Sequence, residues 1–161
     1  MNLDLWLEHD ETVAALTPAE DDFLAWAQAA LAEAGVTGDC ELAVRVVDEA
    51  ESREINHDYR GKDYATNVLS FPADLPDEIL AELPQRPLGD LVICAPVVVR
   101  EAGEQGKPVR EHWAHMTVHG VLHLLGHDHV AAADAAIMEP MEIAALARLG
   151  VGNPYDDEDT P

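Results

Sequence analysis

Four of the chain's eight histidines fall within HGVLHLLGHDH, residues 119 to 129. His119 and His123 are four residues apart, so on a helix both imidazoles would lie on one face, one turn from each other. Gly126 follows three residues later, where a glycine can end a helix and turn the chain back, and His129 then comes within reach. The pattern His-x3-His-x2-Gly-x2-His therefore predicts three ligands for a borderline metal such as zinc.

Three histidine ligands leave one tetrahedral position for water, which is typical of catalytic rather than structural zinc. Zinc would lower the pKa of that water toward ~7. The metzincin proteases share the pattern but carry a general-base glutamate directly after the first histidine, where this chain has Gly120. We therefore expect a catalytic zinc site and disfavour peptide hydrolysis.

Other histidines near this segment are weaker candidates. His112 and His115 would share the helical face of His119 and His123, but histidines in such places often only pack or hydrogen-bond. We consider His115 a candidate substrate contact. His127, between the turn and the third ligand, is equally compatible with a solvent-facing side chain and with a substrate contact.

The most informative basic residue is Arg60, in the stretch NHDYRGKDYATNVLSFP. Its planar guanidinium can hold a phosphate with two hydrogen bonds and stabilise charge that develops on it. The alternative interpretation is an ion pair with Asp58 or Asp63. Lys62 is a further candidate phosphate contact, although a solvated surface base would explain it equally well.

Composition limits the class of protein. A length of 161 residues with 48% hydrophobic content suits a single domain, which we expect at residues 1–153, followed by an acidic C-terminal tail at 154–161. The net charge of −23 repels nucleic acid, so any phosphate contact should be local. Cys40 and Cys94 are expected to be reduced and buried. No apolar run approaches the ~20 residues that cross a bilayer, so we expect a cytoplasmic protein without membrane contact.

Periodicity and capping signals predict the elements that must position these residues. Alternating or β-branched segments predict strands at 2–7, 42–48, 67–72 and 90–94. Caps, prolines and glycines predict helices at 18–34, 49–60, 96–105, 108–125 and 131–149.

Three local expectations accompany these elements. Thr17 and Glu20 should form a capping box at the start of the first helix. A proline-rich loop should run from Pro72 to Gly89. The almost wholly apolar DLVIC, residues 90–94, should be a central strand covered on both faces.

Together these segments resemble the bacterial YbeY family of metal-dependent endoribonucleases. The resemblance is carried by HGVLHLLGHDH with the preceding HWAHMTV, by NHDYRGKDYATNVLSFP and by LGDLVIC, and it extends over nearly the whole chain. It implies an α+β fold with a small four-stranded mixed sheet and about five helices, the metzincin-like motif forming a zinc helix and turn. It implies one zinc ion per chain on His119, His123 and His129, and Arg60 as the other essential residue. His127 stands where tyrosine is frequent in the family.

The resemblance also implies a function and partners. The function is cleavage of single-stranded RNA in 16S ribosomal RNA 3′-end maturation and 70S ribosome quality control. Because the chain is so acidic, we expect the ribosome or a ribosome-associated protein to present the RNA. Two alternatives stay open: a zinc hydrolase of another class, such as a peptidase or amidase, and a non-enzymatic ribosome-assembly factor with structural zinc.

Overall fold

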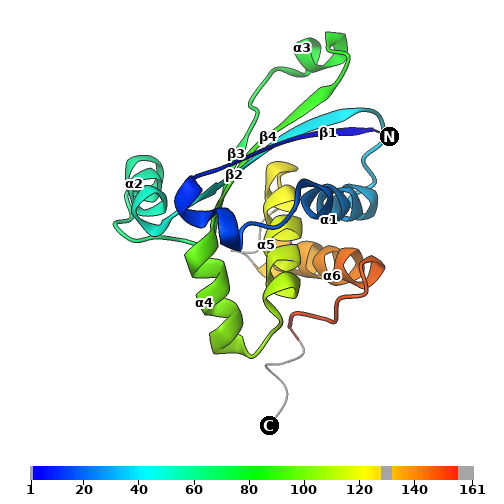
Figure 1. The fold of residues 1–161 in the computed structure, drawn as a ribbon. Coiled ribbons are helices and arrows are strands. Elements are labelled where there is room, and N and C mark those ends of the chain that lie inside the picture. The colour runs from blue at the N-terminus through cyan, green and yellow to red at the C-terminus, as the bar shows by residue number, and fades with distance from the viewer. Residues whose placement is uncertain (1, 128–131, 156–161) are drawn as a thin grey trace.

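A four-stranded mixed sheet is the centre of the fold (Figure 1). The computed structural model describes residues 2–127 and 132–155. The strands lie in the order β1-β2-β4-β3. β2 pairs in parallel with β1 and β4, whereas β3 pairs antiparallel with β4, so the expected mixed sheet is confirmed. The strands are β1 (Leu3–His9), β2 (Cys40–Val47), β3 (Val68–Pro72) and β4 (Arg86–Cys94).

The mixed sheet and the helices packed on it give the expected α+β fold. All the predicted helices are present within a few residues of their expected bounds. The described residues contain α1 (Glu20–Glu33), α2 (Glu49–Arg60), α3 (Asp77–Glu82), α4 (Ala95–Gln105), α5 (Val109–Leu124), α6 (Ala132–Arg148) and a short 3-10 helix, η1 (Glu11–Leu16).

One face of the sheet packs on helices to form the core. Along β2, Leu42 and Val44 are buried whereas Glu41 and Arg45 are exposed, so alternate side chains point to opposite faces. α1 and α5 pack on the buried side, and α5 also contacts α4 and α6. Figure 1 shows α5 in the middle of this assembly. Because neighbours surround α5, its side chains have little freedom to move.

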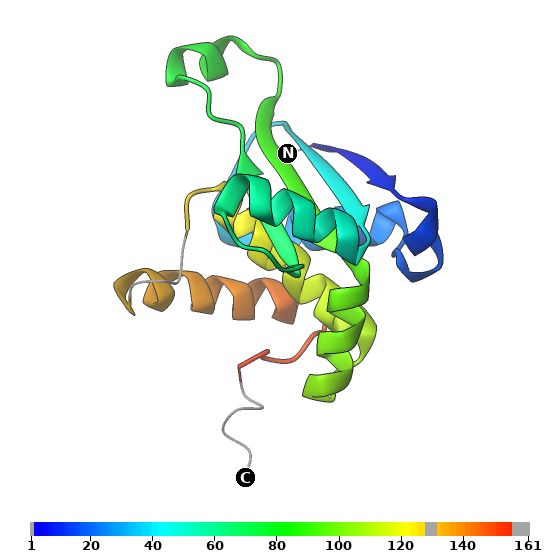
Figure 2. The same ribbon diagram turned by 90° about the vertical axis from the view of Figure 1, so that its left-hand side faces the viewer.

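The other face of the sheet is only partly covered, which corrects the expectation for 90–94. Leu91 and Ile93 are fully buried on the α5 side, but Asp90 is exposed and Val92 is half-buried. Figures 1 and 2 show α2 on the opposite side of the strands from α1 and α5. It contacts β4 there but leaves a groove beside Asp90. A twelve-residue helix is too short to cover that face.

Two other local expectations were wrong. α1 begins after Ala19, and the hydroxyl of Thr17 donates to the carbonyl of Val13 at 2.8 Å instead of capping the helix. The preceding η1 helix brings Val13 within reach of that hydroxyl. The predicted loop from Pro72 to Gly89 contains α3 and the first residues of β4.

The segment with α3 stands away from the other helices (Figures 1 and 2). None of its residues is buried, so no apolar pattern predicts it. Cys40 and Cys94 are buried and unpaired, as expected. No helix among the described residues is both long and apolar enough to cross a lipid bilayer.

Candidate active site

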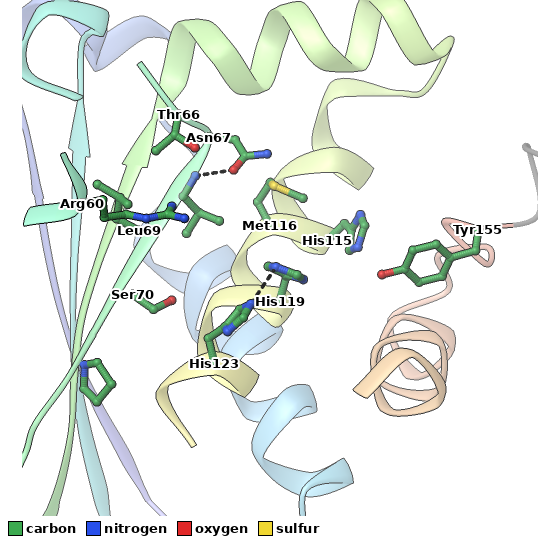
Figure 3. Close-up of a pocket in the computed structure, with 12 residues that line it drawn as sticks. Arg60, Thr66, Asn67, Leu69, Ser70, His115, Met116, His119, His123 and Tyr155 are labelled. Atoms are coloured by element: carbon green, nitrogen blue, oxygen red, sulfur yellow. Dashed lines mark hydrogen bonds between the residues drawn. The ribbon is translucent and has the colours of Figure 1, made fainter. Parts of the chain in front are cut away.

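A cavity of about 660 Å³ lies between β3 and α5. Figure 3 shows His115, His119 and His123 of α5 on one side of it, Arg60 on the side of β3, and Tyr155 approaching from the segment after α6. Twelve residues from these elements line it: Arg60, Thr66, Asn67, Val68, Leu69, Ser70, Pro72, His115, Met116, His119, His123 and Tyr155. The structure thus brings three parts of the chain that are far apart in the sequence, at 60–72, 115–123 and 155, to one site.

His119 and His123 point their outer ring nitrogens at one another. Their Nε2 atoms are 3.1 Å apart, and the contact is drawn in Figure 3. Two nitrogens that bind one tetrahedral zinc ion at about 2.0–2.1 Å would lie about 3.3–3.4 Å apart. The pair therefore needs only a small adjustment to share an ion. The imidazole donors also suit zinc chemically.

The turn after α5 forms as the sequence predicts. α5 ends at Leu124, and Gly126 has a φ of 95°, in the region that favours glycine. The backbone N–H of His127 then donates to the carbonyl of Leu122 at 3.1 Å, which turns the chain back. His129, the predicted third ligand, lies outside the described residues.

A buried carboxylate on α6 supports the histidines. Glu142 is fully buried, and its Oε2 accepts from His115 Nε2 at 2.8 Å and from His119 Nδ1 at 3.1 Å. Burial raises the pKa of this carboxyl, but hydrogen bonds from the two histidines outweigh burial and bring the pKa to about 2. Burial also lowers the pKa of His115, although Glu142 opposes that shift. At neutral pH Glu142 is therefore an ionised acceptor and His115 a neutral donor.

His115, His119 and Glu142 form a group whose ligand atoms all lie within 4.8 Å of one another and could hold a metal ion. The group overlaps the predicted ligand set at His119. It differs by including a carboxylate that does not line the cavity. A ligand set that includes His129 would extend beyond the described residues.

The residues that cap the two ends of α2 determine the position of Arg60. The Asp48 carboxylate accepts from the Glu51 backbone N–H at 2.9 Å, and Gly61 ends the helix with a φ of 68°. Arg60 is the last helical residue and lines the cavity.

Arg60 does not form the alternative ion pair with Asp58 or Asp63. Asp63 pairs with Arg53, at 2.7 Å, and Asp58 lies near His57, at 3.6 Å. Within residues 2–127 and 132–155, Arg60 makes no ion pair, so its exposed guanidinium is available to a ligand.

The remaining candidates divide into those inside and those outside the cavity lining. His115 lines it, while Lys62 and His127 do not. His112 is 2% exposed, and its Nε2 lies 2.9 Å from Glu101, so it packs and hydrogen-bonds away from the cavity.

Sequence reasoning missed the supporting roles of Glu142 and Tyr155. A signal existed for Glu142, because it occupies the position between Met138 and Leu146 on the buried stripe of α6, where an apolar residue is expected. Tyr155 falls in the predicted acidic tail, yet its hydroxyl donates to Glu142 Oε1 at 2.8 Å. No local sequence pattern predicts the hydrogen bond between Tyr155 and Glu142. The tail's residues 156–161 lie outside the described ranges.

Position 120, where metzincins carry their glutamate, lies too close to the sheet for a side chain. A Cβ at Gly120 would lie 2.8 Å from Leu91 Cδ2 and 3.2 Å from Val68 Cγ2. α5 therefore approaches the sheet more closely than a side chain at this position permits. A glutamate could not enter unless the side chains of Leu91 and Val68, or the helix itself, moved.

Comparison with known proteins shows the family of this chain. The sequence profile of the family Endoribonuclease YbeY matches residues 7–150. A protein named Endoribonuclease YbeY from Alkalilimnicola ehrlichii is 58% identical over 153 residues, which cover 95% of this chain and 91% of the relative. A protein of the same name from Pseudomonas putida is 53% identical over 155 residues, covering 96% of each chain.

A solved structure shares the fold. The solution structure of a Thermotoga maritima protein matches with a TM-score of 0.55 at 22% identity, covering 97% of this chain and 96% of the other. The matched sequence profile and the two relatives extend over nearly the whole chain. The chain therefore belongs to the YbeY family of endoribonucleases.

Proposed function

We propose that this chain is a metal-dependent endoribonuclease that cleaves single-stranded RNA in the cavity between β3 and α5. The observation that carries the proposal is that His119, His123 and Arg60 line one cavity. The histidines offer nitrogen ligands for a metal ion, and the arginine offers a planar cation that can bind phosphate. In phosphodiester cleavage a metal ion and an arginine can both stabilise the negative charge that develops in the transition state. RNA is proposed as the substrate because the relatives are named endoribonucleases.

His119, His123 and His129 would hold one zinc ion per chain. The 3.1 Å approach of the first two Nε2 atoms supports their part, and the spacing of the turn at Gly126 supports the third. Zinc bound there would act as a Lewis acid and lower the pKa of a nearby water molecule. The chain supplies the geometry, because α5 is fixed by contacts with the sheet and with α1, α4 and α6.

Arg60 would bind the scissile phosphate. Its guanidinium is exposed at the end of α2, and within the described ranges it is not engaged by an acidic side chain. It can therefore approach two phosphate oxygens and stabilise charge that develops on them. Lys62, also exposed, could contact RNA beyond the cavity, and His115 and His127 remain candidate substrate contacts.

The proposed substrate is the 3′ region of 16S ribosomal RNA, with a further role in 70S ribosome quality control. The net charge of −23 opposes binding of free RNA. We therefore propose that the ribosome, or a protein associated with it, presents the single strand to the cavity. Such a substrate would place the protein in the cytoplasm.

A peptidase or amidase fits the site less well. Gly120 leaves no room for the general-base glutamate of the metzincin arrangement. A factor with purely structural zinc also fits less well, because the histidines line an open cavity instead of being enclosed.

Replacement of Arg60 tests the proposal. Arg60→Ala should reduce cleavage of single-stranded RNA by about 100- to 1000-fold, as loss of one transition-state donor does elsewhere, while zinc content stays at one per chain. Arg53→Ala is the matched control, since Arg53 lies on the same helix but pairs with Asp63. The control should cleave at the wild-type rate. Wild-type cleavage by Arg60→Ala would refute the assigned role.

A further inference from the structure

Glu142 is an unusual residue to find in a core. It is fully buried, and its described partners are His115, His119 and Tyr155, with no lysine or arginine among them. Burying a carboxylate away from water is expensive unless it is well hydrogen-bonded. Its position on α6 would suit an apolar side chain, so stability alone does not account for it.

The hydrogen bonds of Glu142 determine which ring nitrogen of His119 carries the proton. An ionised carboxylate can only accept, so the His119 Nδ1 atom, 3.1 Å from Oε2, must be the donor. In a neutral ring the other nitrogen, Nε2, then carries no proton and presents its lone pair. That nitrogen is the one that lies 3.1 Å from His123 Nε2 on the cavity side.

The carboxylate is itself held in place on both sides. Oε2 also accepts from His115 Nε2 at 2.8 Å, and Oε1 accepts from the Tyr155 hydroxyl at 2.8 Å. Figure 3 shows the Tyr155 ring reaching toward the histidines from the segment after α6. Three donors from two separate parts of the chain therefore fix one buried acceptor.

We propose that Glu142 is a positioning residue of the metal site, which fixes the ring orientation and the Nδ1–H tautomer of His119 so that Nε2 can bind metal. This inference rests on the proposed function, in which His119 is a ligand. Metal-binding histidines commonly donate their second ring nitrogen to a carboxylate, which orients the ring and makes the ligand more basic.

A role as a direct ligand fits Glu142 less well. Glu142 does not line the cavity, whereas His115, His119 and His123 do. Both its oxygens already accept hydrogen bonds. Its closeness to His115 and His119 is therefore explained by hydrogen bonding.

The tautomer can be measured directly in the metal-free protein. Nitrogen-15 NMR of the histidine rings near pH 8 should show His119 protonated on Nδ1 in the wild type. Protonation on Nε2 would overturn the inference, whether or not the protein binds zinc. In Glu142→Leu, which removes the acceptor, the Nδ1–H preference should disappear.

Zinc affinity, measured by competition with a chelator, gives the second readout. Glu142→Leu should bind zinc about 10- to 100-fold more weakly than wild type, as is typical for loss of such a supporting group. Glu142→Gln should lose less, because its amide carbonyl still accepts. Glu139→Leu, on the same helix but outside the cavity lining, is the matched control and should bind as wild type does.

The outcomes separate the two proposals. If the wild type fails to bind zinc, the proposed function is wrong, while the NMR result still decides the role of Glu142. If the wild type binds zinc and folded Glu142→Leu binds equally tightly, the positioning role is wrong. Should the leucine variant not fold, an affinity in Glu142→Gln equal to that of wild type would lead to the same conclusion.

Zinc X-ray absorption of Glu142→Gln should show unchanged ligation, and a lost oxygen ligand would contradict the inference.

Discussion

The hydroxyl of Ser70 on β3 donates a 3.0 Å hydrogen bond to the backbone carbonyl of Gly120 on α5. This bond joins the two walls of the cavity directly. It forms because Gly120 has no side chain to hold the helix away from the sheet. The close packing of α5 on β3 and β4 therefore sets the width of the cavity in which His119 and His123 face Arg60.

Gly120→Ala should destabilise the fold despite alanine's better helix propensity. The new Cβ would meet the fully buried Leu91 at 2.8 Å, and such overpacking typically costs about 1–3 kcal/mol. The helix propensity of alanine returns up to about 1 kcal/mol. We expect a net loss of about 1–2 kcal/mol in the free energy of unfolding, measured by urea denaturation.

Gly103→Ala provides the matched control for that measurement. Gly103 lies within α4, and a Cβ there would meet nothing within 4 Å. The substitution should stabilise the protein by up to about 1 kcal/mol. Equal effects of the two substitutions would show that α5 does not approach the sheet as closely as described.

His123→Ala should lose zinc and stay folded. Removal of a direct ligand should weaken zinc binding by more than the roughly 100-fold limit typical of a supporting group. The core that surrounds α5 does not depend on His123, so circular dichroism and the melting temperature of the metal-free protein should change little. His57→Ala, which removes an exposed histidine on α2, should leave both properties unchanged. An unfolded His123→Ala protein would instead favour a structural metal.

Glu142 should make stability depend on pH in acid. Its pKa is about 2 in the folded protein against an ordinary value of 4.5. A depressed carboxyl pKa stabilises the fold above pH 4.5, and that contribution is lost as the pH falls toward 2. Urea titrations would give the free energy of unfolding of wild type and of Glu142→Gln at each pH. The excess of wild type over the variant should be about 1 kcal/mol smaller at pH 3.5 than at pH 5.5. A constant difference would contradict the ionised, buried carboxylate.

Elements with local signals could be predicted from the sequence. α2 is the clearest example, because Asp48 caps its start and Gly61 ends it. These two positions also determined where Arg60 would lie on the helix. The spacing of His119 and His123 similarly predicted that two rings would converge, because residues four apart on a helix share a face.

Features that depend on contacts distant in sequence could not be predicted. Thr17 has every local property of a helix cap, but η1 brings the Val13 carbonyl closer to its hydroxyl. The exposed face of β4 depends on how far α2 reaches across the sheet, and not on the apolar composition of the strand. The links from Glu142 to His115 and from Tyr155 to Glu142 join segments that no local pattern relates.

Removal of the metal is the most direct test of RNA cleavage at the cavity lined by Arg60, His119 and His123. The rate of cleavage of a single-stranded RNA would be measured before and after the metal is stripped with a chelator, and again after addition of one equivalent of zinc. We expect the rate to fall by about 100-fold or more and to recover with the added zinc, because the ion stabilises charge in the transition state. Cleavage at the original rate by the stripped, folded protein would contradict metal-dependent chemistry at this site.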